Sequence, residues 1–164
     1  MRKARKSHSP TPWIRVGPSP VHGLGAFAER GLPAGALLGV YTGRRYTPGQ
    51  VAGRGWDRQL TYLFQLSNGE MIDGAEGGNA TRHLNHSCEP NCEASEEHDR
   101  RGRPVPVFRT LRPVAAGEEL FIDYSLGCDD GSLPSDYPCR CGAANCRGTL
   151  LAGPEDEAPG RIAA

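Results

Sequence analysis

Glycine and proline recur so often along this chain that long helices are excluded over most of its length. The 164 residues include 22 glycines and 14 prolines, more than a fifth of the total, whereas aromatic residues make up only 7%. Both residues disfavour helix interiors and both are common in turns. The composition therefore predicts a mostly β fold of short strands and many turns, in one domain with a modest core.

Short apolar runs between turn residues mark the expected strands. The clearest run is 60–66, and Ser67-Asn68-Gly69 predicts a hairpin turn after it. Pro106 places the strand expected at 105–110 at a sheet edge, because proline cannot donate a hydrogen bond to a neighbouring strand. We expect a loop with at most a short helix at 44–58, one helical turn at 79–84 and a solvated loop at 96–103. The expected strands are 13–16, 26–28, 36–41, 60–66, 70–73, 92–95, 105–110 and 120–124.

Charge and the N-terminal sequence bear on where the protein acts. The formal net charge is zero, which gives no indication of a nucleic-acid or membrane partner. Residues 1–9 are basic without a following apolar run, and no stretch is long and apolar enough to cross a membrane. We expect a cytoplasmic, bacterial protein with disordered tails at 1–12 and 151–164, while delivery into a host cell stays open. The six cysteines are then thiols or metal ligands rather than disulfides.

Residues 78–92 hold more reactive groups than any other stretch. An ordinary polar loop is one reading of it. A second reading is a thiol hydrolase pair, but neighbours on one turn rarely present both groups to one substrate, and the sequence reveals no orienting partner or oxyanion donors. The consecutive amide, imidazole, hydroxyl and thiol side chains are Asn85, His86, Ser87 and Cys88.

Three cysteines near the C-terminus, at 139, 141 and 146, have only small or polar residues between them. Thiolates at this spacing suit tetrahedral zinc, and a structural site normally has four protein ligands. A cluster of free or disulfide-linked cysteines is the alternative. The available fourth ligands are Cys88, Cys92, Cys128 and His86.

Four blocks of the chain together resemble SET-domain protein lysine methyltransferases that carry a zinc-binding post-SET segment. The resemblance covers 13–150 and implies a SET-domain fold of small curved β-sheets with a C-terminal pseudoknot. It assigns 13–125 to the SET domain and 126–150 to the zinc-bound post-SET loop. The blocks are His22-Gly23-Leu24-Gly25; Ile72-Asp73 with Gly78-Asn79 and Arg82-x-x-Asn85-His86-Ser87-Cys88; Gly117-Glu118-Glu119-Leu120-x-x-Asp123-Tyr124; and Cys139-x-Cys141-x4-Cys146-x-Gly148.

The resemblance implies transfer of a methyl group from S-adenosyl-L-methionine (SAM) to a deprotonated lysine of a protein substrate. Tyr124 and Tyr41 match the catalytic and channel tyrosines, and Ile122 and Tyr137 the substrate channel. Ile122 stands where the family carries a Phe or Tyr that limits methyl number, which favours higher methylation states. The alternative is a catalytically inactive SET-like module that binds basic peptides.

The same resemblance gives the cofactor and metal residues. Arg82 would pair with the methionine carboxylate, and His83 replaces the family's usual aromatic residue. For zinc the resemblance selects Cys88 as the fourth ligand, beside Cys139, Cys141 and Cys146. The implied SAM-binding residues are Gly23, Leu24, Gly25, Tyr62, Arg82, His83, Asn85, His86 and Leu150.

The substrate is expected to be a protein with an exposed lysine in a basic tail, such as a histone, a histone-like protein or a ribosomal protein. The chain itself offers only Lys3 and Lys6. Ala4-Arg5-Lys6-Ser7 resembles the sequence around methylated lysines in histone H3 tails, so Lys6 is a candidate for automethylation; a generic basic tail is the alternative. The sequence leaves the oligomeric state open.

Overall fold

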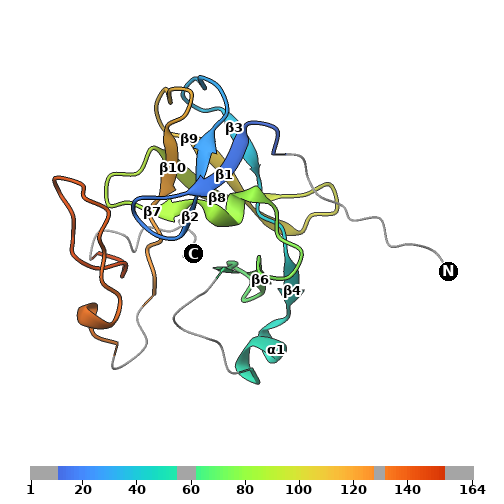
Figure 1. The fold of residues 1–164 in the computed structure, drawn as a ribbon. Helices are drawn as coiled ribbons and strands as arrows, with labels where there is room; N and C mark the ends of the chain where they lie inside the picture. The colour runs from blue at the N-terminus through green and yellow to red at the C-terminus, as the bar shows by residue number, and fades with distance from the viewer. Residues whose placement is uncertain (1–10, 55–61, 128–131, 154–164) are drawn as a thin grey trace.

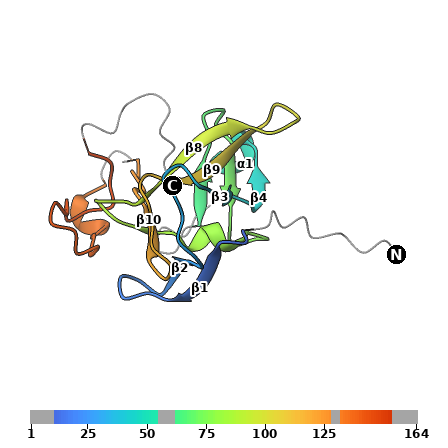
Figure 2. The same cartoon turned by 90° about the horizontal axis from the view of Figure 1, so that it is seen from above.

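The computed structural model describes residues 11–54, 62–127 and 132–153, and it is built mainly of short strands (Figures 1 and 2). The mostly β prediction is confirmed. Helical structure in the described residues comprises α1 (Pro48–Ala52) and the 3-10 turns η1 (Ala80–His83) and η2 (Pro134–Asp136). The strands are β1 (Ile14–Pro18), β2 (Leu24–Ala28), β3 (Leu37–Val40), β4 (Arg44–Tyr46), β5 (Leu63–Gln65), β6 (Met71–Asp73), β7 (Asn85–His86), β8 (Cys92–His98), β9 (Pro104–Thr110) and β10 (Glu119–Ile122).

The strands form three small sheets, in the orders β1-β2-β10-β7, β3-β9-β8 and β4-β6-β5. Their pairings are antiparallel except for that between β7 and β10, where Asn85 lies opposite Phe121 and His86 opposite Ile122. This parallel contact places the last strand against the central polar stretch, as the expected pseudoknot requires. It is the contact that makes one site from two distant segments.

A shared core joins the three sheets. Phe108 of β9, Ile72 of β6 and Leu120 of β10 are each at most 2% exposed. The ring of Phe64 in β5 packs edge-on against Phe108, with centroids 5.6 Å apart, and at 4.9 Å from the ring of Tyr41. Burial of these side chains, worth about 1.5–3 kcal/mol each, holds the sheets in fixed positions around the site.

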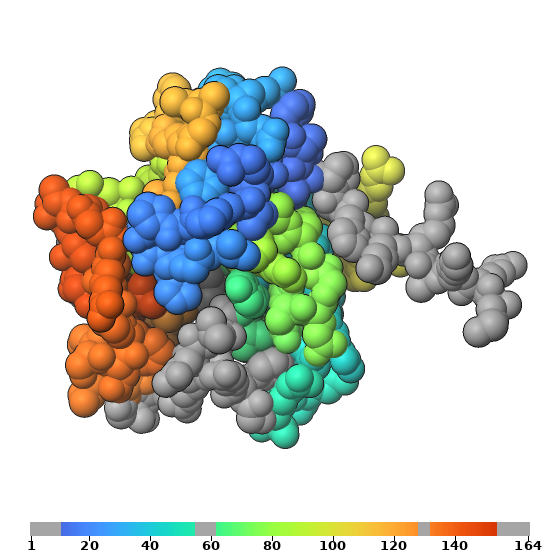
Figure 3. All heavy atoms as spheres, viewed as in Figure 1, coloured from blue at the N-terminus to red at the C-terminus, as the bar shows by residue number. Residues whose placement is uncertain are grey.

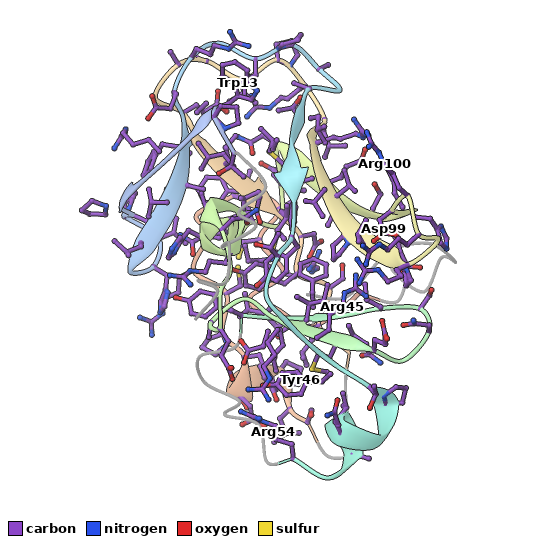
Figure 4. All side chains as sticks on the ribbon, turned by 90° about the vertical axis from the view of Figure 1, so that its right-hand side faces the viewer. Trp13, Arg45, Tyr46, Arg54, Asp99 and Arg100 are labelled. Atoms are coloured by element: carbon purple, nitrogen blue, oxygen red, sulfur yellow. The ribbon has the colours of Figure 1, made fainter. Side chains whose placement is uncertain are left out.

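The strand β4 lies in a segment that we expected to be a loop. Its sequence has no apolar alternation, yet Tyr46 is only 3% exposed. The guanidinium groups of Arg44 and Arg54 lie over its ring at 5.2 and 4.9 Å, and its hydroxyl donates to Glu76. Figure 4 shows Arg54 beside Tyr46. Arginine side chains thus cover the aromatic ring where apolar residues are absent.

The strand β9 is central and not at an edge, so that prediction is wrong. It lies between β3 and β8, and the Pro106 carbonyl accepts a hydrogen bond from the Tyr41 amide. Pro106 has no N–H to donate, but this disrupts the β3–β9 pairing little, because β3 ends at Val40, which pairs with Val107. The strand β8 continues through 96–98, where a loop was expected, and Glu97 pairs there with Arg109 of β9 at 2.8 Å.

The ordered body extends slightly beyond the predicted boundary at residue 150. Leu151 is 4% exposed and forms a bridge with Leu126. Most of both predicted tails, 1–10 and 154–164, lies outside the described residues. A search of the described helices finds none with the length and apolar character needed to span a membrane.

Candidate active site and metal centre

A cavity of about 710 Å³ opens where the four-stranded sheet, β5 and the C-terminal segment (residues 132–153) meet. In Figure 3 the orange-red atoms of that segment border the blue atoms of the N-terminal strands. The cavity brings together residues from all four of the blocks singled out in the sequence. The predicted residues that line it are Gly23, Leu24, Tyr41, Tyr62, Arg82, His83, Asn85, His86, Ile122, Tyr124, Tyr137 and Leu150.

Asn85 ties the glycine loop to the central stretch. Its amide nitrogen lies 3.2 Å from the carbonyl oxygens of His22 and Leu24 and 3.0 Å from a carboxylate oxygen of Glu119. The side chain is buried, at 7% exposure, so these bonds are protected from competing water. Asn85 therefore shapes one wall of the cavity.

Gly25 does not line the cavity; it makes room for Glu119. A Cβ atom at this position would lie 2.1 Å from a Glu119 carboxylate oxygen. Gly23, by contrast, borders the cavity and has φ of +47°, which an L side chain rarely adopts. The two glycines of the loop thus serve different purposes, and a cofactor contact at Gly25 stays a prediction.

Two tyrosine hydroxyl groups reach the cavity with their protons already engaged. Tyr41 Oη donates to the Tyr62 carbonyl at 2.6 Å, and Tyr124 Oη donates to the Leu84 carbonyl at 3.0 Å. Burial, and after it neighbouring tyrosines and acids, raises the pKa of both phenols, so both are neutral at physiological pH. Because a hydroxyl has one proton and two lone pairs, each oxygen can still accept a hydrogen bond.

Arg82 and His83 form a polar edge of the cavity beside Tyr62. Arg82 Nε donates to His83 Nε2 at 3.2 Å, and Arg82 Nη1 donates to the Gly74 carbonyl at 3.0 Å. Within the described part of the chain, no carboxylate forms an ion pair with Arg82. A cation so placed suits a carboxylate ligand.

His86 connects the cavity to the cysteine cluster. Its Nδ1 accepts a hydrogen bond from the Tyr124 amide at 3.1 Å, which leaves the proton on Nε2, 3.3 Å from Cys88 Sγ. Burial lowers the pKa of His86, and although Asp123 acts in the opposite direction the net shift is downward. The imidazole is therefore neutral, and its Nε2–H points at Cys88 Sγ, the kind of hydrogen bond that orients a sulfur group for a metal.

Four cysteine side chains converge at the C-terminal segment. The sulfur atoms of Cys88, Cys139, Cys141 and Cys146 all lie within 4.8 Å of one another. The Cys88 and Cys139 sulfurs are 3.8 Å apart, and a tetrahedron with Zn–S bonds of about 2.3 Å has edges of about 3.8 Å. The cluster thus fits zinc in size and donor type.

Two backbone amides donate to sulfur atoms of the cluster, although burial leaves the pKa of Cys88 and of Cys139 raised. The amides of Arg147 and Gly148 donate to Cys88 Sγ and Cys146 Sγ, both at 3.4 Å. Burial raises the pKa of Cys141, but amide bonds and neighbouring thiols lower it more, to about 6. Of the other candidate ligands, Cys92 is buried elsewhere at 1% exposure and Cys128 lies outside the described residues.

Comparison with known proteins assigns the chain. Residues 23–125 match the SET domain. The chain belongs to the SET domain family. Across 140 residues (79% of the chain), this SET domain is 33% identical to human histone-lysine N-methyltransferase 2B, of which the match covers 5%.

Two further relatives show the same relationship. One is histone-lysine N-methyltransferase Su(var)3-9 of Drosophila pseudoobscura pseudoobscura, 35% identical over 148 residues, with 79% of the chain and 23% of that protein covered. The other is the H3 lysine-4 specific histone-lysine N-methyltransferase of Chaetomium globosum, 31% identical over 143 residues, with 84% and 13% covered. The SET domain described here therefore spans less than a quarter of each of these three relatives.

The structure removes one sequence argument against the hydrolase reading of this SET domain. His86 and Cys88 do meet, and Asp123 supplies a partner 3.5 Å from His86 Nδ1. The reading still fails, because Nδ1 accepts from the Tyr124 amide and has no proton for Asp123. Cys88 also faces the three thiols of Cys139, Cys141 and Cys146, a set that suits a metal ion better than an acyl substrate.

Sequence reasoning missed the role of Asp123 and Arg147 in this SET domain. The Arg147 guanidinium donates to both carboxylate oxygens of Asp123, at 2.6 and 2.8 Å. Asp123 stood within a quoted block and Arg147 directly follows Cys146, so both lay close to recognised residues. Their pairing across 24 positions has no local signature.

Proposed function

We propose that this SET domain is a SAM-dependent protein-lysine N-methyltransferase. The observation that carries the proposal is the pair of neutral tyrosine hydroxyls, Tyr41 and Tyr124, whose lone pairs are available in one cavity. That cavity is bordered by the glycine loop and by Arg82. The names of the relatives support lysine as the acceptor.

The cavity wall promotes deprotonation of a lysine. A free lysine has a pKa of about 10.4 and is charged at neutral pH. Phe64, Phe108 and Ile122 line the cavity and are each at most 3% exposed. Apolar surroundings disfavour the ammonium form and lower the pKa of an inserted amine.

The tyrosines then hold the neutral amine in place. Tyr124 Oη accepts an N–H of the lysine while its own O–H still donates to the Leu84 carbonyl, which fixes the direction of the nitrogen lone pair. Tyr41 Oη, held by the Tyr62 carbonyl, acts in the same way from the other wall. Bound SAM supplies an electrophilic methyl group on a sulfonium, and alignment of donor and acceptor provides much of the rate enhancement.

The remaining residues hold the cofactor and the metal. Arg82 pairs with the methionine carboxylate, and the backbone at 22–24, fixed by Asn85, lies along the cofactor. Zinc at the four cysteines fixes the C-terminal segment, with Tyr137 and Leu150, over the cavity. A histone-like basic tail is the proposed substrate, and Lys6 is proposed as a site of automethylation.

The test is intact-mass measurement after incubation with SAM and a synthetic Ala-Arg-Lys-Ser peptide, with the Tyr124→Phe, Tyr46→Phe and Lys6→Arg variants. Each transfer adds about 14 Da. The rate at which this mass appears should fall about 100-fold in Tyr124→Phe, since loss of one oriented catalytic hydrogen bond has this order of effect. Tyr46, a buried tyrosine outside the cavity, is the matched control and should leave the rate unchanged.

The other two outcomes separate the remaining readings. Mass that appears on the chain and disappears in Lys6→Arg identifies automethylation. If calorimetry detects peptide binding but neither SAM binding nor methyl transfer, the protein is a binding module and the proposal is wrong.

A further inference from the structure

The C-terminal segment is attached to the strand body by an ion pair as well as by the cysteine cluster. Arg147 makes two parallel bonds to Asp123, at 2.6 and 2.8 Å, and the two side chains are only 27% and 17% exposed. Two-point guanidinium–carboxylate bonds fix orientation as well as distance. In Figures 1 and 2 the segment lies at the side of the body near β10, the strand that Asp123 follows.

Asp123 in turn holds the backbone around Tyr124. Its Oδ1 accepts a hydrogen bond from the Ser125 amide at 3.0 Å. Ser125 has φ of +42° and is 8% exposed, a left-handed conformation that is unfavourable for a residue with a side chain. The carboxylate therefore stabilises an unfavourable turn that directly follows the catalytic residue.

A second contact fixes Tyr124 from the other side. The Tyr124 amide donates to His86 Nδ1. This imidazole nitrogen also lies 3.5 Å from Asp123 Oδ1. Burial would raise the pKa of Asp123, but the Arg147 guanidinium and the Ser125 amide lower it more, so the carboxylate is charged. The backbone of residues 123–125 thus depends on a carboxylate whose orientation Arg147 sets.

We propose that Arg147 is a positioning residue: docking of the C-terminal segment orients Asp123, and through it the turn at 123–125, so that Tyr124 reaches its working geometry only when the segment is in place. This inference rests on the proposed methyl transfer. It makes closure of the cavity and alignment of the catalytic tyrosine a single event.

The kinetic test uses Arg147→Lys, Arg147→Gln, Asp123→Asn and the double variant Arg147→Gln/Asp123→Asn, with the Ala-Arg-Lys-Ser peptide and SAM. We expect kcat to fall about tenfold in Arg147→Gln and Asp123→Asn, and no further in the double variant, because both remove one interaction. Lysine has a single ammonium and cannot reproduce the two-point bond, so Arg147→Lys should recover only part of the rate. Zinc content should stay at one ion per chain in every variant.

Arg103→Gln is the matched control. Arg103 pairs with Asp99 at 2.7 Å, and Asp99 lies on the face turned away from the C-terminal segment (Figure 4). This change removes an arginine–aspartate pair without touching the site, so kcat should not change. Additive losses in the double variant, or a loss confined to the SAM KM or the zinc content, would overturn the inference.

A second readout requires no methyl transfer and so separates failure of this inference from failure of the proposed function. Amide hydrogen exchange at residues 123–126 should accelerate about tenfold in Arg147→Gln and stay unchanged in Arg103→Gln. If exchange there is the same in both variants, Arg147 does not hold the turn, whatever the activity of the protein.

Discussion

The Glu119 carboxylate fits beside the glycine loop only because Gly25 has no side chain. The carboxylate occupies the space of a Cβ atom at Gly25 and holds the amide of Asn85. Because Asn85 also bonds the loop carbonyls, a small change at Gly25 is transmitted to the cavity wall.

Gly25→Ala should therefore lower the free energy of unfolding by about 1–3 kcal/mol, the usual cost of overpacking, and weaken SAM binding. Urea unfolding and calorimetry measure the two effects. Gly49→Ala is the control: Gly49 is in α1, and outside its own stretch of helix no described atom lies within 4 Å of a Cβ there, so it should be neutral or stabilising. Equal stability of the two variants would show that Glu119 moves aside freely.

His83→Phe should flatten the dependence of stability on pH. Burial, and after it the charge of Arg82, lowers the pKa of His83 in the folded protein, so the unfolded chain binds the proton more tightly. Stability is then lost as pH falls through the unfolded value of about 6.5, and the loss levels off below the folded pKa. Urea unfolding at pH 7.5 and 5.5 should show a smaller decrease for the variant; identical decreases would contradict the assignment.

At the scale of strands, Asn91 fixes where β10 begins. Its amide donates to the Glu119 carbonyl at 2.7 Å, and its oxygen accepts from the Phe121 amide at 2.8 Å. The residue is 2% exposed, so water does not replace these partners. The Asn91 side chain thus makes two hydrogen bonds to the backbone of β10, as a neighbouring strand would.

Asn91→Ala should lower the free energy of unfolding by about 2–6 kcal/mol, since the buried Glu119 carbonyl and the partly buried Phe121 amide lose their partner at about 1–3 kcal/mol each, with the amide towards the lower end. Urea denaturation of Asn91→Ala beside Asn68→Ala provides the comparison. Asn68 lies in the exposed β5–β6 turn, and its loss should cost less than about 1 kcal/mol. A near-neutral Asn91→Ala would mean that β10 holds its place through sheet pairing alone.

The strands that the sequence predicts well are those with clear apolar runs. The β5–β6 hairpin was predicted because an Asn-Gly turn separates two such runs. The strand β4 was missed because arginines bury Tyr46, and β9 was misplaced because the cost of Pro106 depends on where its neighbour ends. The cavity residues came from the family resemblance, whereas the Arg147–Asp123 contact requires the folded chain.

At the scale of the whole molecule, the cysteine cluster joins the strand body to the C-terminal segment. Cys88 belongs to the strand body and the other three cysteines to the C-terminal segment. A zinc ion at these cysteines would stabilise this segment, which has few apolar residues of its own.

Removal of zinc by a chelator should therefore abolish SAM binding and expose the C-terminal segment to protease, while the β signal in far-UV circular dichroism is retained. Calorimetry, limited proteolysis and circular dichroism measure the three effects, and added zinc should restore binding. Full SAM affinity in the metal-free protein would show that the cavity forms without the cluster.

The position of β10 between β2 and β7 also sets when the site can assemble during protein synthesis. The free edge of β2 waits for a partner about ninety residues further along the chain, which takes about 5–20 s to synthesise. By the end of that interval the nascent polypeptide has a glycine loop and a central polar stretch, but Tyr124 is not yet beside them. Translation must pass Tyr124 before the two halves of the site can meet, and a chain that terminates before β10 leaves an open edge on β2 that invites aggregation.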